Sequence, residues 1–295
     1  MTDERVLYQA VYNLHKYGFV YVTGVPEDET SVENLAERIG VLKTTFYGRT
    51  WDVRSVPDAI NVAYTAQDLG FHMDLCYMEQ PPHLQLLHCI RASSAGGASV
   101  FTDSYKALQL LAREHPADFS TLQHVQIGFH YNHPDSNLYA QKRAVLEPQS
   151  HLWAKRSIEM DPQSRLGAIR RKAAKGEIRA NVFWSPPFQS PLDMHDPMVE
   201  KWHHAARTFN GLLHRPEAIH ERMMKPGECV IFDNRRVLHA RKAFEVGDIG
   251  KERWLKGCYV DMDPYKSKLH TLMHRFGKDP DAAGIEGQTS KQASK

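Results

Sequence analysis

Two short segments, far apart in the chain, constrain its fold and chemistry more than any other feature. The first is His72-Met73-Asp74, and the second is 233–241, which contains His239. Alternate residues of a β-strand share a face, so His72 and Asp74 can reach one metal ion from a single strand. A histidine from a distant strand would complete a facial ligand set and leave coordination positions open, as non-heme iron(II) oxygenases require. We therefore predict that His72, Asp74 and His239 bind iron(II).

A second triplet with the same pattern, His133-Pro134-Asp135, competes for this role. Proline fixes φ and removes a strand donor, and the flanking Asn132 and Ser136 are typical of turns. We interpret His133 as a loop residue for this reason. The segment after His72 instead predicts a strand, a tight turn and a strand, at 84–90, 96–97 and 99–101.

Composition limits the classes of partner. The net charge is +2 and the basic residues are scattered, which argues against a nucleic-acid-binding surface. No segment approaches the roughly 18 consecutive apolar residues of a membrane span, and the polar start does not resemble a signal peptide. The four cysteines lie in apolar runs without C-x-x-C spacing, which is typical of reduced core residues. We expect a cytoplasmic protein that acts on a small-molecule substrate and has no nucleic-acid or membrane partner. The sequence does not decide whether it is a monomer or a homodimer.

Apolar periodicity favours one large, mostly β domain with helical decoration. A helix is expected over 6–14, ended by Gly18, and a short strand over 19–22. Ser31 is expected to cap the next helix, which reaches Gly40. Strands and turns dominate from about residue 60, with later strands at 229–232 and 255–260.

A helix-rich insertion is expected at about 103–220. It contains a helix over 105–114, capped by Asp103 or Ser104, and another over 197–213, capped by Asp196 with Pro197 in its first turn. The polar segment 132–180 is expected to form an irregular excursion over the mouth of the active site. We predict a single catalytic domain over 1–276 and a disordered tail over 277–295.

A second group of residues supports the iron site. Arg253 begins the last apolar strand, where its guanidinium could bind a carboxylate through two parallel hydrogen bonds. Ser99, just after Gly96-Gly97, could offer a hydroxyl to the same carboxylate. A surface position for Arg253, between Glu252 and Trp254, is the alternative. The pair predicts an anchor for a carboxylate co-substrate.

Blocks at both ends of the chain resemble the γ-butyrobetaine dioxygenase branch of the taurine dioxygenase-like superfamily. The matching segments are 61–64, 71–74, 81–82, 85–89, 232–241 and 253–261. The resemblance implies a double-stranded β-helix, or jelly roll, that uses iron(II), 2-oxoglutarate and dioxygen. By position, His72, Asp74 and His239 match the metal ligands of the family, and Arg253 and Ser99 match its 2-oxoglutarate-binding residues.

The same resemblance implies a set of substrate residues. Four aromatic side chains match a cage for a trimethylammonium group, and Asn61 matches a contact to the substrate carboxylate; the cage residues are Tyr47, Trp51, Tyr64 and Tyr259. Leu75 stands where the family pattern has a cage tyrosine, and Trp184 lies in an apolar run that replaces an asparagine-rich one. We expect a small cationic or zwitterionic substrate, similar to an amino acid or betaine but different from γ-butyrobetaine. A core role for these aromatic residues is the alternative.

The expected reaction is hydroxylation of an unactivated C–H bond. Desaturation, cyclisation or C–C cleavage of a more apolar metabolite by the same cofactors is the alternative, and the carboxylate of Asp74 argues against halogenation. Asp233 and Asn234 are expected to orient His239 through hydrogen bonds. A non-catalytic metal-binding barrel would not need the Arg253 and Ser99 pair, and a zinc hydrolase would need a general base that the sequence does not place near the triad.

Overall fold

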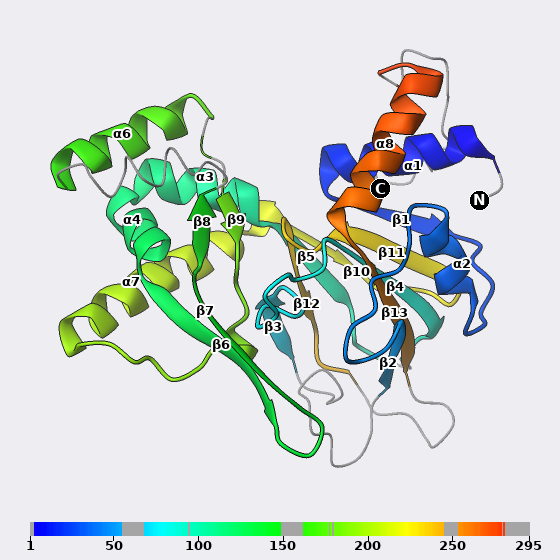
Figure 1. The fold of residues 1–295 in the computed structure, drawn as a ribbon, viewed down its shortest axis with the longest axis horizontal. Helices are drawn as coiled ribbons and strands as arrows, with labels where there is room; N and C mark the ends of the chain where they lie inside the picture. The colour runs from blue at the N-terminus through cyan, green and yellow to red at the C-terminus, as the bar shows by residue number, and fades with distance from the viewer. Residues whose placement is uncertain are drawn as a thin grey trace.

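Two antiparallel sheets form the centre of the structure, and helices cover them on two sides (Figure 1). The computed structural model describes residues 3–54, 68–93, 95–148, 162–176, 178, 180–244, 253–278 and 280. The five-stranded sheet has the order β1-β11-β4-β13-β2, with strands Phe19–Thr23, Glu228–Asp233, Leu84–Arg91, Trp254–Val260 and Thr50–Arg54. The four-stranded sheet has the order β10-β5-β12-β3, with strands Ile219–Arg222, Ser99–Asp103, Val237–Arg241 and Leu69–His72.

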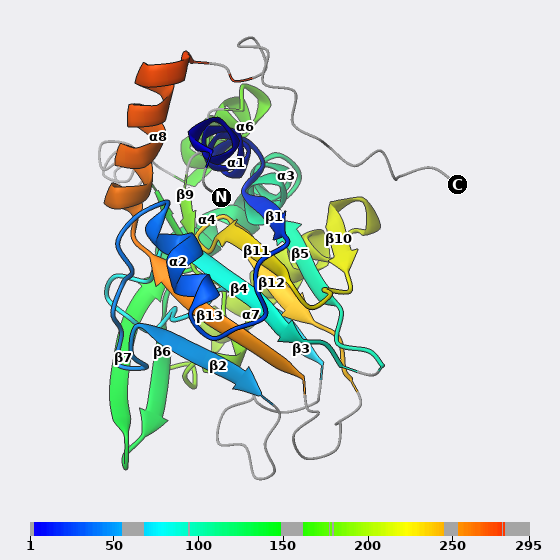
Figure 2. The same cartoon turned by 90° about the vertical axis from the view of Figure 1, so that its right-hand side faces the viewer.

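The two sheets share an apolar core. Leu87 and Phe232 from the five-stranded sheet pack in one cluster with Phe101 and Val237 from the four-stranded sheet. Alternate residues of β4 face the other way, and Leu86 packs under three helices that cover the outer face. These helices are α1 (Glu4–Tyr17), α2 (Ser31–Glu37) and α8 (Met262–Phe276). Figure 2 shows α8 and α1 above the five-stranded sheet.

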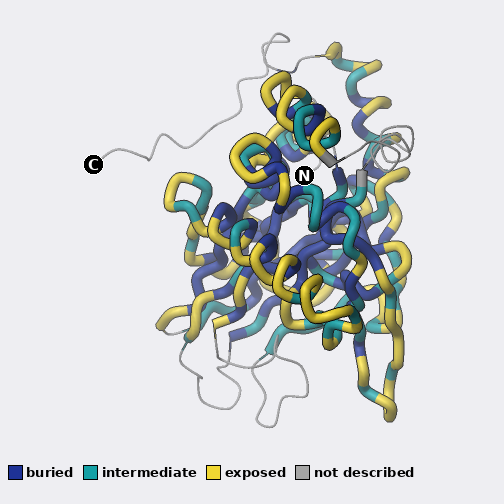
Figure 3. Tube along the Cα trace, turned by 90° about the vertical axis from the view of Figure 1, so that its left-hand side faces the viewer, coloured by how far each residue is buried: buried dark blue, intermediate teal, exposed yellow. Residues whose placement is uncertain are grey.

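A second group of elements lies between β5 and β10 in the chain and beside the four-stranded sheet in space (Figure 1). Its helices are α3 (Ser104–Glu114), α4 (Pro116–His124), α6 (Pro162–Ala174) and α7 (Asp196–Leu213), with the short helices η2 (Pro186–Phe188) and η3 (Pro216–Ala218). Two small sheets join them, made of β6 (Gln126–His133) with β7 (Asn137–Ala144), and β8 (Leu146–Pro148) with β9 (Ala180–Val182). Figure 3 shows that burial is concentrated where these elements meet the sheets, while the β6–β7 hairpin tip is exposed.

Helix ends follow local chemistry closely. Gly18 ends α1 with φ of 86°, a left-handed conformation that glycine adopts without strain, as expected. Asp103 caps α3 by accepting a hydrogen bond from the backbone of Tyr105. Ser31 is not a cap: the carboxylate of Asp28 accepts from its backbone N–H, and Ser31 is the first residue of α2. Asp196 is likewise the first residue of α7 rather than its cap.

The expected fold class is confirmed in part: several antiparallel sheets form the centre as predicted, but the fold is mixed α and β rather than mostly β. Sequence reasoning did not predict α8, whose apolar face covers the sheet. The described part of 132–180 is not irregular, since it contains β7, β8 and all of α6. His133 is the last residue of β6 rather than a loop residue, because only 134–136 form the hairpin turn.

All four cysteines are free and buried, as predicted. No helix in the described part of the chain is long and apolar enough to cross a membrane. The expected tail at 277–295 lies almost wholly outside the described residues.

Candidate active site

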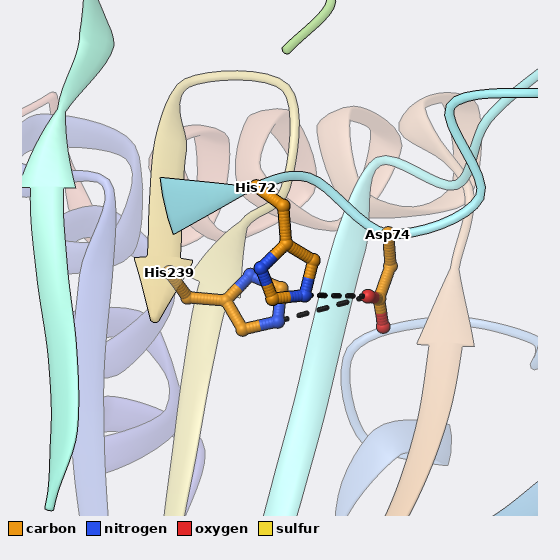
Figure 4. Close-up of side chains that lie close together, drawn as sticks. All are labelled: His72, Asp74 and His239. Atoms are coloured by element: carbon orange, nitrogen blue, oxygen red, sulfur yellow. Dashed lines mark ion pairs between the residues drawn. The ribbon is translucent and has the colours of Figure 1, made fainter. Parts of the chain in front are cut away.

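Two neighbouring strands place the histidines of the predicted triad side by side. His72 ends β3 and is the direct cross-strand partner of His239 on β12, and their ring centroids are 4.2 Å apart. Both imidazoles point toward Asp74 (Figure 4), with Nε2 of His72 3.5 Å and Nε2 of His239 3.7 Å from its Oδ1. One ligand atom from each residue lies within 4.8 Å of the others. The structure therefore brings the three predicted ligands together.

Asp74 reaches the site by a different route from the one expected. Strand β3 ends at His72, and Asp74 lies in the turn that follows, so the two residues do not alternate along one strand. Leu75 comes next, with φ of 57°, a left-handed conformation that costs a non-glycine residue on the order of 1 kcal/mol. A bent turn held under some strain, rather than strand alternation, therefore aims the carboxylate at the histidines.

Asn234 holds this turn in place. Its Oδ1 accepts from the backbone N–H of Asp74 at 2.9 Å, and its Nδ2 donates to the carbonyls of Asp74 at 3.1 Å and Pro82 at 3.2 Å. The expectation that Asn234 orients His239 was wrong, because its hydrogen-bonding groups are used by the turn. Asp233 lies 3.6 Å from Nε2 of His83 instead. The Nδ1 of His239 is buried and has no hydrogen-bond partner among the described residues.

Two arginines fix the rest of the loop that follows Asp74. Arg143 on β7 donates from Nη2 to the carbonyls of Met78 at 3.0 Å and Glu79 at 3.2 Å. Arg235 donates to the carbonyl of Pro81. Charged donors on otherwise unpaired backbone carbonyls keep a loop in one conformation. Sequence reasoning missed these contacts because Arg143 lies in a segment that was expected to be irregular.

The ionisation of the triad suits a cation. Burial would raise the pKa of Asp74, but the hydrogen bond from His72, the electrostatic influence of the two imidazoles and the hydrogen bond from Tyr259 outweigh it and hold the pKa at about 2. Burial, with repulsion from His72, lowers the pKa of His239 to about 3. At neutral pH the site therefore presents one carboxylate and a neutral His239 imidazole, the forms that bind a metal ion.

A pocket of about 520 Å³, counted to its open mouth, begins at the triad. Arg253, Arg241 and Ser99 line it together with all three triad residues. Arg241 is the cross-strand partner of Ser99 and lies two residues beyond His239, so it shares a strand face with that ligand. Sequence reasoning did not single out Arg241, although its spacing from His239 was a usable signal.

Arg253 is a buried cation rather than a surface residue, with 6% of its surface exposed. Burial and the nearby Arg241 lower its pKa to about 10, so it remains charged at neutral pH. Among the described residues no carboxylate forms an ion pair with it. A buried charge without a partner is costly, and a bound anion would remove that cost.

The predicted substrate residues are only partly gathered around this pocket. Trp51 lines it, and Tyr259 stacks on Trp51 with ring centroids 5.4 Å apart. Tyr47 does not line the pocket; its hydroxyl lies 2.6 Å from that of Tyr77, and both rings belong to the same apolar cluster as Tyr259. Leu75 and Trp184 are buried in the core beside the helices. Asn61 and Tyr64 lie outside the described residues.

Another polar residue of the site was missed. Gln85 on β4 is completely buried and donates from Nε2 to Oδ2 of Asp74 at 2.7 Å. The hydroxyl of Tyr259 donates to the same oxygen at 2.8 Å. A single glutamine within the apolar run of 84–90 was the sequence signal that could have found it, because buried polar groups are normally hydrogen-bonded.

The fold and this ligand set are those of the non-heme iron dioxygenases that use 2-oxoglutarate, and comparison with known proteins agrees. The family model for "Taurine catabolism dioxygenase TauD, TfdA family" matches residues 2–259. The chain therefore belongs to the TauD/TfdA family. A crystal structure of an asparagine oxygenase with Fe(II), hydroxyasparagine and succinate has the same fold, with a TM-score of 0.62 over 86% of this chain and 79% of that one, at 16% identity.

Two curated relatives are similar along most of this chain. "Dioxygenase str8" of Strobilurus tenacellus is 36% identical over 270 residues, which are 87% of this chain and 57% of the relative. The γ-butyrobetaine dioxygenase of Homo sapiens is 31% identical over 271 residues, 91% of this chain and 63% of the relative. The chain thus spans about three fifths of the length of these relatives.

Proposed function

We propose that this chain is an iron(II)- and 2-oxoglutarate-dependent oxygenase that hydroxylates an unactivated C–H bond of a small molecule. One observation carries the proposal: a single pocket has a complete metal ligand set, His72, Asp74 and His239, and a buried cation, Arg253, that has no carboxylate partner in the described part of the chain. A plain metal-binding barrel has no use for that cation. A metal ion and a dicarboxylate together satisfy both features.

The donor set fits iron(II). Two imidazoles and one carboxylate are the ligands that non-heme iron oxygenases use, and they leave positions for a co-substrate and dioxygen. His72 has its Nδ1 at 2.9 Å from the carbonyl of Gly70, which leaves Nε2 for the metal. Once bound, iron supplies the activation of dioxygen that C–H hydroxylation requires.

The protein's own residues bind and orient the co-substrate. Arg253 and Ser99, which line the same pocket as the triad, would hold the far carboxylate of 2-oxoglutarate and direct its 2-oxo acid end toward the metal ligands. The guanidinium can bind both carboxylate oxygens at once, which fixes the direction of the molecule in the pocket. Apolar walls that include Leu87 and Leu255 exclude water around it and strengthen these contacts.

For the substrate we propose a small cationic or zwitterionic molecule similar to an amino acid or betaine. The similarity to γ-butyrobetaine dioxygenase supports this class, as does the stacked pair of Trp51 and Tyr259 beside the triad, because aromatic faces attract cations. Leu75 and Trp184, which depart from the γ-butyrobetaine pattern, favour a substrate other than γ-butyrobetaine. Desaturation, cyclisation or cleavage of a more apolar metabolite is the second candidate, since the pocket walls are largely apolar.

The test is turnover against a panel of betaines, amino acids and neutral analogues. Protein supplied with iron(II), 2-oxoglutarate and air should form succinate in proportion to a product that is one oxygen atom heavier than its substrate. A product two hydrogens lighter would show desaturation instead. Failure to convert 2-oxoglutarate to succinate with any compound, and without one, would contradict the proposed activity.

A further inference from the structure

The two carboxylate oxygens of Asp74 have different surroundings. Oδ1 faces Nε2 of His72 and Nε2 of His239, at 3.5 and 3.7 Å (Figure 4). Oδ2 accepts two hydrogen bonds, from Gln85 Nε2 at 2.7 Å and from the Tyr259 hydroxyl at 2.8 Å. Both donors therefore engage the same oxygen, and the other oxygen is left for a metal ion.

This pair of donors is built into the sheet. Gln85 on β4 and Tyr259 on β13 are direct cross-strand partners, with 0% and 3% of their surfaces exposed. The ring of Tyr259 stacks on Trp51, and Trp51 lies against Gly257, where a Cβ would collide with the indole. A glycine on one strand thus admits a ring that fixes the orientation of Tyr259.

We propose that Gln85 and Tyr259 are positioning residues that hold Asp74 with Oδ1 directed at the metal site. Metal ligands are commonly oriented by hydrogen bonds to their free atoms, and loss of such a partner lowers metal affinity. Without the two donors, the carboxylate would be free to turn away from His72 and His239, and metal binding would weaken. The inference rests on the proposed function for the identity of the metal site, and it assigns the Tyr259 hydroxyl to the metal ligand rather than to the substrate.

The test measures metal affinity without co-substrate or turnover. Metal-free protein is titrated with Mn(II), and the free ion is followed by electron paramagnetic resonance. Tyr259→Phe keeps the stacked ring and removes only the hydroxyl, and Gln85→Met keeps the length of the side chain. Each should weaken Mn(II) binding about 10- to 100-fold, the usual effect of removing a partner of a metal ligand. Tyr21→Phe on β1 is the matched control, because its buried hydroxyl has no hydrogen-bond partner among the described residues, and the Mn(II) affinity of this variant should not change.

The decisive arm repeats Tyr259→Phe in an Asp74→Ala background, where weak binding by two imidazoles remains. A positioning residue that acts through Asp74 should have no further effect there, because the two changes share one interaction. An equal loss in both backgrounds, or unchanged affinity in both Tyr259→Phe and Gln85→Met, would overturn the proposal. The melting temperature of each metal-free variant shows whether it is folded. If Tyr259→Phe does not fold, Gln85→Met replaces it in this experiment. If the effect of Tyr259→Phe on Mn(II) affinity depends on Asp74 but the protein shows no oxygenase turnover, the proposed function is refuted and this inference stands.

Discussion

The two ends of the pocket differ in how their charges are satisfied. At the metal end, hydrogen bonds hold Asp74 on both its backbone and its side chain, through Asn234, Gln85 and Tyr259. At the other end, Arg253 is buried, has no carboxylate partner among the described residues, and lies near Arg241. The first end is preorganised before its ligand arrives, whereas the second has a buried charge whose cost a bound anion would reduce.

This difference separates two kinds of substitution. Changes at the metal end should break contacts that exist in the free protein, and so should lower its stability or its metal affinity. Changes at the arginine end should leave the free protein as stable as before and appear only when the co-substrate is present.

The largest effect is expected from His239→Ala. This imidazole is a proposed ligand, and its Nδ1 has no hydrogen-bond partner among the described residues. Its removal therefore leaves no Nδ1 partner unpaired. Metal binding and turnover should be abolished while the far-ultraviolet circular dichroism spectrum is retained. Asp74→Ala should keep weak metal binding through two imidazoles. Full activity in His239→Ala would remove the basis of the metal site.

Arg253→Met should raise the 2-oxoglutarate concentration for half-maximal turnover about 10- to 150-fold, the worth of a charge-assisted hydrogen bond. It should also leave the unfolding free energy of the free protein unchanged or higher, because the substitution removes a buried charge for which the described residues offer no carboxylate. 2-Oxoglutarate should raise the melting temperature of the iron-loaded parent protein and not that of the variant. An unchanged requirement for 2-oxoglutarate would assign the anchor to another residue.

Asn234→Ala should act in the opposite way, lowering the stability of the free protein. It removes three hydrogen bonds, to two atoms of Asp74 and to Pro82, at a completely buried position. We expect a loss of about 2–4 kcal/mol in urea unfolding, since the partners are left buried and unpaired. Asn132→Ala, at an exposed position of the β6–β7 hairpin, is the control and should change stability little. Equal effects of the two would mean that Asn234 does not support the turn.

The sequence was most informative where a function needs particular residue types. The triad was predicted correctly because few positions combine the right ligands with strand-like flanks. The role of Asn234 was misassigned, and Gln85 was missed, because both act across long sequence separations that depend on the pairing of strands. The argument from strand alternation predicted the right ligands, but its geometry was wrong for Asp74, which lies beyond the end of β3.

Larger parts of the fold were also harder to predict. α8 has weak local signals and is stabilised by packing Tyr265 and Leu269 on the sheet. β7 was expected to be irregular because the segment 132–180 is polar, but β7 pairs with β6 along its whole length and its Arg143 packs over the Phe183 ring. Tertiary contacts outweigh local preference in both cases.

The pH dependence of stability should reveal the buried metal end. The pKa of His239 is lowered from 6.5 to about 3 in the folded metal-free protein, so between these values the unfolded chain binds a proton that the native state does not. Unfolding free energy should therefore fall on acidification below pH 6.5, by up to about 1.4 kcal/mol per pH unit from this residue. Asp74 adds to the loss below pH 3.8, its ordinary value. Urea unfolding at several pH values should show a shallower decline in His239→Ala, and an identical slope would contradict the burial argument.

The smallest expected effect concerns the substrate. If Trp51 contacts a positive charge, substrates with an ammonium group should be preferred over neutral analogues of the same shape by about tenfold or more. Trp51→Leu, assayed at saturating metal, should reduce that preference while uncoupled conversion of 2-oxoglutarate continues. Indifference to charge in the parent protein would show that the aromatic residues form an apolar wall.

The most direct test of a two-ended pocket is an anaerobic titration of the iron(II)-loaded protein with 2-oxoglutarate, followed by visible absorption. Chelation of iron by the 2-oxo acid should produce a weak charge-transfer band that saturates at one equivalent in the parent protein. Arg253→Met should reach the same band only at concentrations about 10- to 150-fold higher, and His239→Ala should not produce it. Saturation of Arg253→Met at the same concentration as the parent, or the absence of a band in the parent, would contradict the account.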